Sequence, residues 1–263
     1  MISRELKIFL TALMFYTRIP CPKIDDYSPD DLNKATRYFP LVGWIVGGIS
    51  FGVFWISSLI FDANIAVLLS IICGVLVTGA FHEDGLADMF DGFGGGWTKE
   101  KILEIMKDSR VGAYGAIALT FLFAIKFLAL NSIVLKFENR GYLLICYMFI
   151  AYHSLSRLTA INIVFTSSYS REDASSKSKP IAKAHTFVEI IGAYFFGLLP
   201  LLALCFFNWK FLLVMLSLAT LYFLTNRYFN RWIDGYTGDC LGAVEQMAEC
   251  VCLLTFAALW KFL

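Results

Sequence analysis

Long apolar segments alternate with shorter polar ones along most of this chain. A helix needs about 20 mostly apolar residues to cross a bilayer. The apolar segment 5–17 is too short to cross easily, and we interpret it as an interfacial helix. The segments that reach or approach the spanning length are 41–60, 63–81, 111–135, 141–164, 186–207, 210–226 and 241–262. The pattern therefore predicts an all-α polytopic membrane protein with roughly seven transmembrane helices and a short N-terminal interfacial helix.

The composition agrees with this interpretation and narrows the function. Hydrophobic residues make up 58% of the 263 positions and charged residues 16%, whereas soluble domains carry about 25% charged residues. The net charge of +1 gives no support to nucleic acid as a partner. Since no internal repeat or linker divides the chain, residues 1–263 are expected to form a single integral-membrane domain in the lipid bilayer.

The longer polar loops predict how the protein is oriented. Four of them, 18–40, 82–110, 157–185 and 227–240, hold most of the lysine and arginine residues that lie outside the apolar segments. Loops rich in these residues stay on the cytoplasmic side of the membrane. We therefore expect a protein of the cytoplasmic (inner) membrane whose active site faces the cytoplasm.

A dense acidic stretch, "HEDGLADMFDGFGGG" at 82–96, directly follows the apolar segment 63–81. Asp84, Asp88 and Asp91 are spaced i, i+4, i+7, so on a helix they lie within about 60° of one another. Three carboxylates on one face near lipid repel each other, and a divalent cation is the simplest compensation. Oxygen ligands favour Mg²⁺, with Mn²⁺ as the alternative metal. A solvated helix end, whose acids only mark the membrane boundary, would explain the pattern without a metal.

Glycines and basic residues after this stretch indicate anion binding. Gly94 and Gly95 would let the backbone approach a phosphate closely. Lys107 and Arg110 are candidates for holding phosphate oxygens, and Asp108 between them is a candidate ligand or general base. Anchoring of the protein by positive charge is the competing explanation for the two basic residues.

A second polar cluster, "NRWIDGYTGDCLGAVEQMAE", lies near the C-terminus. Asp239 stands between glycines at an expected helix start, which makes it a further candidate metal ligand. Glu245 and Glu249 fall inside the last apolar segment, where acids either mark a site or bond to neighbouring helices.

Two basic residues also lie within apolar segments. Arg157 interrupts the segment 141–164, where it would either reach an anion from the cytoplasmic end or extend along the helix to water. Lys126 lies in the middle of 111–135 and needs a partner that the sequence does not identify.

Four motifs together resemble the blocks of the cobalamin synthase family, also called adenosylcobinamide-GDP ribazoletransferases. The motifs are "HEDGLADMFDGFGGG", "IMKDSRVGAYG", "RYFPLVGWIVGG" and "GYTGDCLGA". The likeness runs from "TRIPCP" near the start to the last helix, so it covers nearly the whole chain.

The resemblance implies a transferase of cobalamin (vitamin B12) biosynthesis that joins adenosylcobinamide-GDP to α-ribazole or its 5′-phosphate. A ribazole hydroxyl would attack the phosphorus attached to cobinamide, GMP would leave, and Mg²⁺ is the expected cofactor. The product would be adenosylcobalamin or its 5′-phosphate. Association with a second copy or with other corrinoid-pathway enzymes is left open.

Together, the two lines of argument assign roles to particular residues. Either Asp91 or Asp108 would act catalytically by taking the proton of the attacking hydroxyl. The expected metal ligands are Asp84, Asp88, Asp91 and Asp239. The expected phosphate-binding residues are Lys107, Arg110, Arg157, Gly94 and Gly95.

Two other functions compete with this one. A CDP-alcohol phosphotransferase has an acidic block of similar style, and it would release CMP from a lipid substrate. A cation-coupled transporter would carry cations or protons on the acids that lie within apolar segments, namely Glu189, Glu245 and Glu249.

Overall fold

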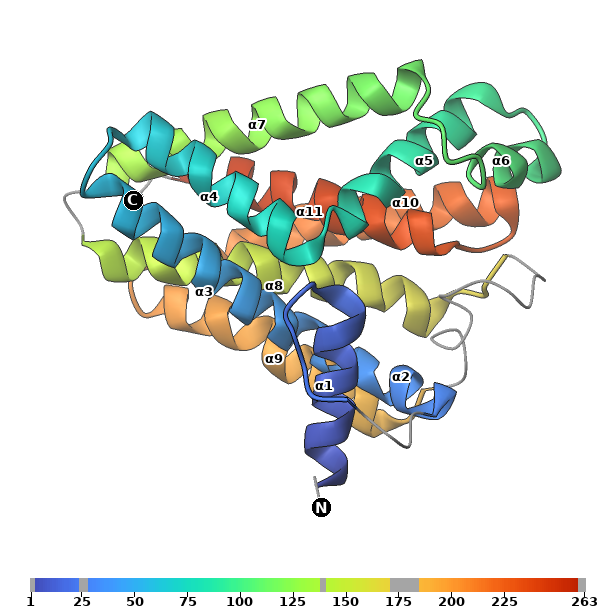
Figure 1. Cartoon of the computed structure of the whole chain (residues 1–263), viewed down its shortest axis with the longest axis horizontal. Coiled ribbons are helices and arrows are strands. Elements are labelled where there is room, and N and C mark those ends of the chain that lie inside the picture. Colours follow the sequence, from blue (N-terminus) through green and yellow to red (C-terminus); the bar gives the residue numbers. More distant parts are fainter. Residues whose placement is uncertain (1–2, 24–27, 138–140, 171–184, 260–263) are drawn as a thin grey trace.

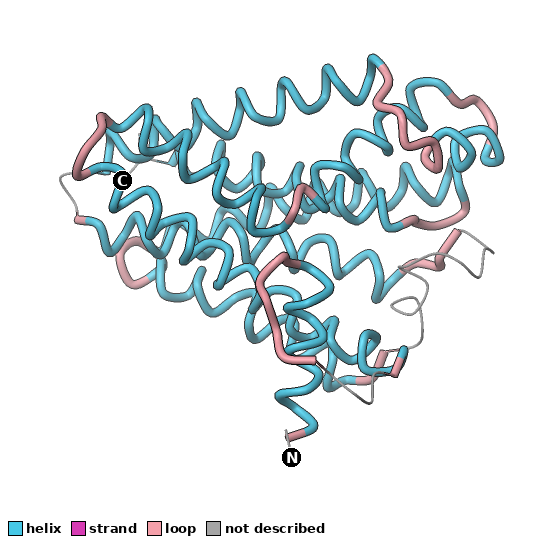
Figure 2. Tube along the Cα trace, viewed as in Figure 1, coloured by secondary structure: helices cyan, strands magenta, loops and turns pink. Residues whose placement is uncertain are grey.

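The computed structural model describes residues 3–23, 28–137, 141–170 and 185–259 (Figures 1 and 2). Within those ranges the regular structure is helical, apart from an isolated bridge between Tyr169 and Tyr236. The elements are α1 (Arg4–Tyr16), α2 (Pro29–Ala35), η1 (Thr36–Tyr38), α3 (Phe39–Ser58), α4 (Ala63–Thr78), α5 (Phe81–Gly95), α6 (Lys99–Ile105), α7 (Ala113–Phe137), α8 (Tyr142–Thr166), α9 (Phe187–Cys205), η4 (Trp209–Leu213), α10 (Val214–Ile233) and α11 (Gly238–Leu259).

The expected all-α membrane fold is confirmed, because each predicted apolar segment contains a helix. Among the described residues, six helical stretches are long and apolar enough to cross a membrane, and α4 with α5 makes a seventh if the bent pair counts as one span. In Figure 1 the helices α3 and α7–α11 lie along one common direction, with α1 running across it. That placement of α1 suits the interfacial helix expected at 5–17.

The predicted span 63–81 ends early, and the acidic residues after it lie on a separate helix. Helix α4 stops at Thr78, and α5 leaves at an angle of 87°. The turn uses two consecutive left-handed residues, Gly79 at φ 68° and Ala80 at φ 56°. Glycine adopts this conformation without a steric cost, and the Ala80 N–H closes the end of α4 by donating to the Val75 carbonyl at 2.9 Å. The acidic residues therefore occupy a helix of their own.

Helices α8 and α11 form the centre of the bundle. The spanning window of α8 is 83% buried and that of α11 is 67% buried, whereas the window of α10 is only 17% buried. Helix α8 contacts α3, α9 and α11, and α11 also contacts α5 and α7. Polar side chains on these two helices are consequently held inside the protein rather than against lipid.

Small residues bring α3 very close to α8. A Cβ atom added at Gly43 would lie 2.5 Å from the His153 carbonyl oxygen, and one at Gly47 would lie 2.7 Å from that of Phe149. Larger residues at either position would push the helices apart. This close approach fixes the height and rotation of α8, which carries two of the buried charged residues described below.

Candidate functional site

Helix α5, which carries the acidic residues, runs from the bend after α4 toward the end of the bundle that also holds α6 (Figure 1). Asp84 is exposed, Asp88 is half-buried and Asp91 is buried. The three residues share one helix, as expected, but they occupy different environments. Only the first part of the acidic face is therefore open to a ligand from outside.

Asp91 has a structural role that the spacing alone did not indicate. Its carboxylate accepts the backbone N–H of Gly112 at 2.7 Å and that of Gly115 at 2.9 Å. These N–H groups belong to the start of α7, where a helix has unsatisfied donors and a partial positive charge. A Cβ atom at either glycine would lie within 2.5 Å of an Asp91 oxygen, so the motif "VGAYG" provides room for this carboxylate.

The two acidic regions of the sequence meet where α5 packs on α11. A Cβ atom at Gly85 would lie 3.1 Å from the Asp239 Cα atom and 3.4 Å from that of Gly242. Asp239 itself is half-buried, and its Oδ2 accepts the Thr237 hydroxyl at 3.3 Å. Because Asp84 directly precedes Gly85, contact between the helices brings the second predicted cluster beside the first.

The basic segment after α6 is exposed, and its charges interact with each other. Lys107 and Arg110 lie on the surface. The Arg110 guanidinium donates to both carboxylate oxygens of Asp108, at 2.6–3.1 Å. These hydrogen bonds, together with one from the Arg110 backbone N–H, lower the pKa of Asp108 to about 2. A carboxyl with so low a pKa is a weak proton acceptor. This arrangement therefore makes Asp108 a poorer candidate for the general base than Asp91.

Gly94 and Gly95 have different surroundings at the end of α5. A Cβ atom at Gly94 would meet the Tyr114 ring at 2.5 Å, so this glycine makes room for an aromatic side chain of α7. Gly95 is exposed, and a Cβ atom there would lie 3.3 Å from the Ile105 side chain. Of the two, Gly95 is the glycine whose backbone an anion approaches more easily.

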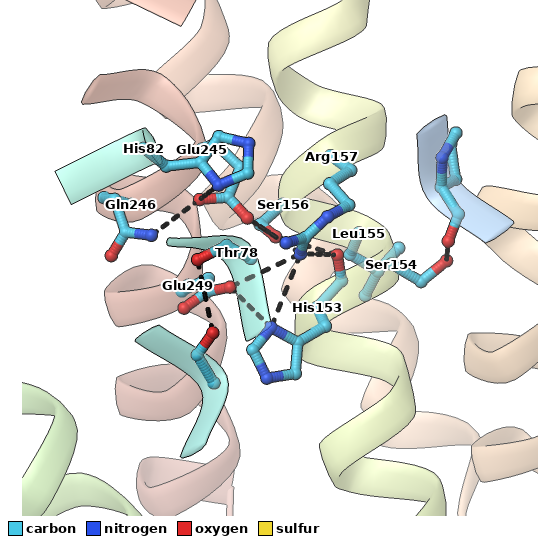
Figure 3. A network of polar contacts seen from close by, with 12 residues as sticks. Thr78, His82, His153, Ser154, Leu155, Ser156, Arg157, Glu245, Gln246 and Glu249 are labelled. Atoms are coloured by element: carbon cyan, nitrogen blue, oxygen red, sulfur yellow. Dashed lines mark hydrogen bonds and ion pairs between the residues drawn. The ribbon is translucent and has the colours of Figure 1, made fainter. Parts of the chain in front are cut away.

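A network of buried charged residues lies among α5, α7, α8 and α11 (Figure 3). Lys126 of α7, whose partner the sequence did not identify, is 2.6 Å from Glu249 Oε2. The other oxygen of Glu249 is 2.6 Å from His153 Nδ1. Lys126 also donates to the Gln246 side chain at 2.5 Å. Lys126 and Glu249 thus each have an opposite charge beside them.

Arg157 belongs to this network and is buried inside the bundle. Its side chain is 1% exposed, and its Nη1 is 2.8 Å from Glu245 Oε1 and 2.8 Å from the His153 carbonyl oxygen. Figure 3 shows the guanidinium between Glu245 and His153. The predicted contact with substrate phosphate would therefore require the Arg157 side chain to leave this ion pair.

Two further residues of the network, His82 and Glu83, were not singled out as site residues from the sequence. Glu83 Oε2 and both ring nitrogens of His82 lack a hydrogen-bond partner among the described residues. Glu83 lines a cavity of about 20 Å³ together with Lys126 and His153, which is room for about one water molecule. The position of His82 and Glu83 directly after an apolar segment could have marked them as candidate site residues. The sequence did not show the bend at Gly79 that turns them toward the interior.

The carboxylates available to a metal fall into two groups. Among the described residues, His153, Glu245 and Glu249 bring ligand atoms within 4.8 Å of one another, but Lys126 and Arg157 already neutralise these acids. Asp84, Asp88 and Asp91 form no such tight group in the described ranges.

The oxygen chemistry that Mg²⁺ prefers is nevertheless present where α5 and α11 meet. Asp84 is exposed there, Asp88 is half-buried, and Asp239 lies against Gly85. Because Asp84 is exposed, waters and phosphate oxygens, which usually complete the magnesium shell, can reach this second location. The donor set fits a magnesium ion better here than in the buried network.

Comparisons with known proteins place this geometry in context. Residues 8–257 match the protein family described as cobalamin-5-phosphate synthase. The chain is 44% identical over 262 residues to the adenosylcobinamide-GDP ribazoletransferase of Shewanella amazonensis, covering 98% of each chain. It is 44% identical over 255 residues to the protein of the same name from Shewanella frigidimarina, covering 97% of this chain and 95% of the relative. No solved structure matches the chain.

Proposed function

Because the chain belongs to the cobalamin-5-phosphate synthase family, we propose that it joins adenosylcobinamide-GDP to α-ribazole, or to its 5′-phosphate, and releases GMP. The family match confirms the resemblance seen in four sequence motifs. It also supports the expected role as a transferase of cobalamin biosynthesis. The observation that carries the specific reaction is the identity of 44% over 98% of both chains with a relative named for this activity.

The reaction exchanges one phosphorus–oxygen bond for another. A hydroxyl oxygen of ribazole bonds to the phosphorus attached to cobinamide, and the bond from that phosphorus to the bridging oxygen breaks. GMP leaves with the bridging oxygen, and the hydroxyl proton passes to a base or to water. Such a transfer depends mainly on positioning and on neutralisation of negative charge.

The residues suited to this task lie along the α5–α11 contact. Asp84, Asp88 and Asp239 would hold Mg²⁺, with Mn²⁺ as an alternative. When bound, the metal would neutralise diphosphate oxygens and the departing GMP. Gly95 ends the acidic helix, and Lys107 and Arg110 follow α6. The backbone of the first and the side chains of the other two would contact phosphate.

Asp91 remains a candidate base, although its oxygens also hold the start of α7. A base must lie within hydrogen-bonding reach of the hydroxyl whose proton it takes. Asp91 is buried beneath the open part of the acidic face. If it is the base, the ribazole hydroxyl must therefore enter between α5 and the start of α7.

The proposed orientation puts the acidic helix at the cytoplasmic face of the inner membrane. The charged loops that support this orientation connect helices at the same end of the bundle as α5 and α6 (Figure 1). Part of the loop 157–185 lies outside the described residues. An enzyme so placed would take both water-soluble substrates from the cytoplasm.

The competing transporter function is less well supported by the contacts of its three acids. Glu189 caps its own helix by accepting the Thr186 N–H at 2.9 Å, and it lies 3.7 Å from Arg37. Glu245 and Glu249 are paired with cationic side chains. The match over residues 8–257 is to the cobalamin-5-phosphate synthase family, which favours the proposed reaction over the CDP-alcohol phosphotransferase alternative.

A direct assay tests the proposed reaction. The purified protein in detergent, given adenosylcobinamide-GDP and α-ribazole, should release GMP with Mg²⁺ and lose this activity with a chelator. Release restored by Mn²⁺ would extend the choice of metal. GMP release that is unaffected by chelation would overturn the metal proposal but leave the transferase intact. No release from folded protein with either ribazole form would overturn the transferase itself.

A further inference from the structure

A groove opens on the outside of the bundle between α9 and α10, over the surface of α8. Its volume is about 270 Å³. Leu155 and Leu158 of α8 form part of its floor, while Met215, Leu218 and Ala219 of α10 line one wall. Since α10 is mostly exposed and the chain spans a membrane, the groove faces the lipid. An unfilled apolar groove in a bilayer is a place where an acyl chain can lie.

One end of this groove is polar. Thr166 of α8 and Tyr222 of α10 line it, and the Tyr222 hydroxyl donates to Thr166 Oγ1 at 2.8 Å. Immediately beyond them, Ser167, Asn226 and Asn230 hydrogen-bond to each other at 2.6–3.2 Å. The groove thus changes from apolar to hydrogen-bonding along its length, as the surface of an amphipathic ligand does.

A positive charge stands at the polar end. Arg227 follows Phe223, a groove-lining residue, by four positions on α10, so the two side chains share a helix face. Arg227 is exposed, and no acidic side chain in the described part of the chain pairs with it. Basic side chains between helices at the cytoplasmic side of a membrane protein bind anionic lipid headgroups. Under the proposed orientation, Arg227 lies on that side.

We propose that this groove is a binding site for one anionic phospholipid. One acyl chain would lie along the apolar floor and wall, the glycerol esters would meet Tyr222 and Asn226, and the headgroup phosphate would contact Arg227. The guanidinium is suited to this contact because its planar donors match a phosphate group. The polar end of the groove lies near the acidic helix, since the Phe93 ring of α5 is 4.9 Å from that of Tyr228. The residues that line the groove belong to α8, α9 and α10, and none of them is assigned to the proposed reaction.

Native mass spectrometry of the purified full-length protein tests the site. The detergent-solubilised protein is stripped of lipid and titrated with phosphatidylglycerol or with phosphatidylcholine. The wild type should bind one phosphatidylglycerol more tightly than any phosphatidylcholine. Arg227→Gln should weaken the binding of phosphatidylglycerol roughly tenfold, since a charge-assisted phosphate contact is lost. It should weaken that of phosphatidylcholine less, because the choline cation already offsets the phosphate charge of that lipid.

Filling the groove should remove the acyl-chain site. Ala219→Trp should abolish the tight binding of one phosphatidylglycerol molecule. If tryptophan prevents folding, Ala219→Leu is used instead, and it should also weaken this binding. Matched controls on the same helix are Leu216→Trp, at a lipid-facing position that is 70% exposed, and Arg231→Gln. Both control variants should bind phosphatidylglycerol as the wild type does.

Other results would overturn the proposal. Equal binding of the two lipids, or unchanged phosphatidylglycerol binding in the Arg227 and Ala219 variants, would show that the groove holds no specific lipid. Displacement of the lipid by α-ribazole would make it a substrate groove, and pairing of two chains through it would make it an interface. Because lipid binding is measured without substrates, these results are distinct from failure of the proposed transferase.

Discussion

At the scale of single residues, neighbouring carboxylates of one motif have different tasks. Asp91 holds the start of α7 through two backbone N–H groups. Glu83 faces the buried network, about 100° around the helix from Asp84. Asp84 and Asp88 are the members of the acidic face that remain most accessible. The identity of a residue as aspartate or glutamate is thus not enough to assign its role.

The accessible acids give a first prediction. Asp88→Asn and Asp84→Asn should each lower GMP release by about 10²–10³-fold, because each change removes a negative charge where the metal and diphosphate would lie. Asparagine keeps the shape of the side chain. The measurement is GMP release by protein of normal thermal stability, and raised Mg²⁺ or added Mn²⁺ should partly restore it.

The matched control is Glu104→Gln on α6. This glutamate is exposed and forms only a surface pair with Lys101 at 3.0 Å, so activity should stay near normal. If the double variant Asp84→Asn, Asp88→Asn also retained near-normal turnover, these two residues would not be ligands of a catalytic metal.

At the scale of helices, the fold depends on interruptions and close approaches. The break between α4 and α5 turns the acidic segment by 87°, which lets one end of α5 enter the buried network and the other reach the surface. The glycines of α3 let α8 approach closely enough to place His153 and Arg157 in the same network. Helix packing, rather than loop structure, therefore positions these charges.

The α3–α8 approach gives a second prediction. Gly47→Ala should reduce thermal stability by about 1–3 kcal/mol, because the new Cβ atom would lie 2.7 Å from a backbone carbonyl oxygen that cannot easily move. Gly48→Ala is the control, since a Cβ atom there meets nothing within 4 Å. Alanine also favours the helix more than glycine does. Equal unfolding temperatures for the two variants in detergent would contradict this contact.

The buried ion pairs give a third prediction. Lys126→Met should destabilise the protein by about 3–5 kcal/mol, because it leaves the Glu249 charge buried with less compensation. Adding Glu249→Gln to this variant should recover part of the lost thermal stability. Lys136→Met, near the end of α7, should have little effect, since Lys136 only reaches the Ala257 carbonyl oxygen at 3.5 Å. If the double variant were less stable than Lys126→Met, the Lys126 charge would not be compensating the buried charge of Glu249.

At the scale of the whole molecule, the two ends of the bundle differ. One end carries α5, α6 and the longer loops, while short turns join the helices at the other end (Figure 1). The proposed substrate site and the polar end of the α8–α10 groove are both near the first end. An enzyme built in this way would take its substrates from one side of the membrane.

This asymmetry gives a fourth prediction. A cysteine introduced at Ser109, in the exposed segment after α6, should react with a membrane-impermeant thiol reagent only after cells are opened. One introduced at Phe206, which is 93% exposed at the other end, should react in intact spheroplasts. Both need a background without the seven native cysteines. The reverse labelling pattern would place the acidic helix outside the cytoplasm.

The sequence by itself determined the class of the protein and most of its helices. Apolar length decides whether a helix can cross a bilayer, and this property is local, so the spans followed directly from the order of residues. The i, i+4, i+7 spacing likewise placed Asp84, Asp88 and Asp91 on one helix without any tertiary information. The four motifs identified the family because they are themselves runs of sequence.

Only the tertiary structure decided which charges meet. The partners of Lys126 and His153 lie 120 and 96 positions away along the chain, and no local pattern encodes such a pairing. The break at Gly79 and the capping of α7 by Asp91 depend on how helices pack, as does the burial of Arg157. A charged side chain inside a membrane bundle must find a compensating group, and the packing of α5, α7, α8 and α11 determines which group it finds.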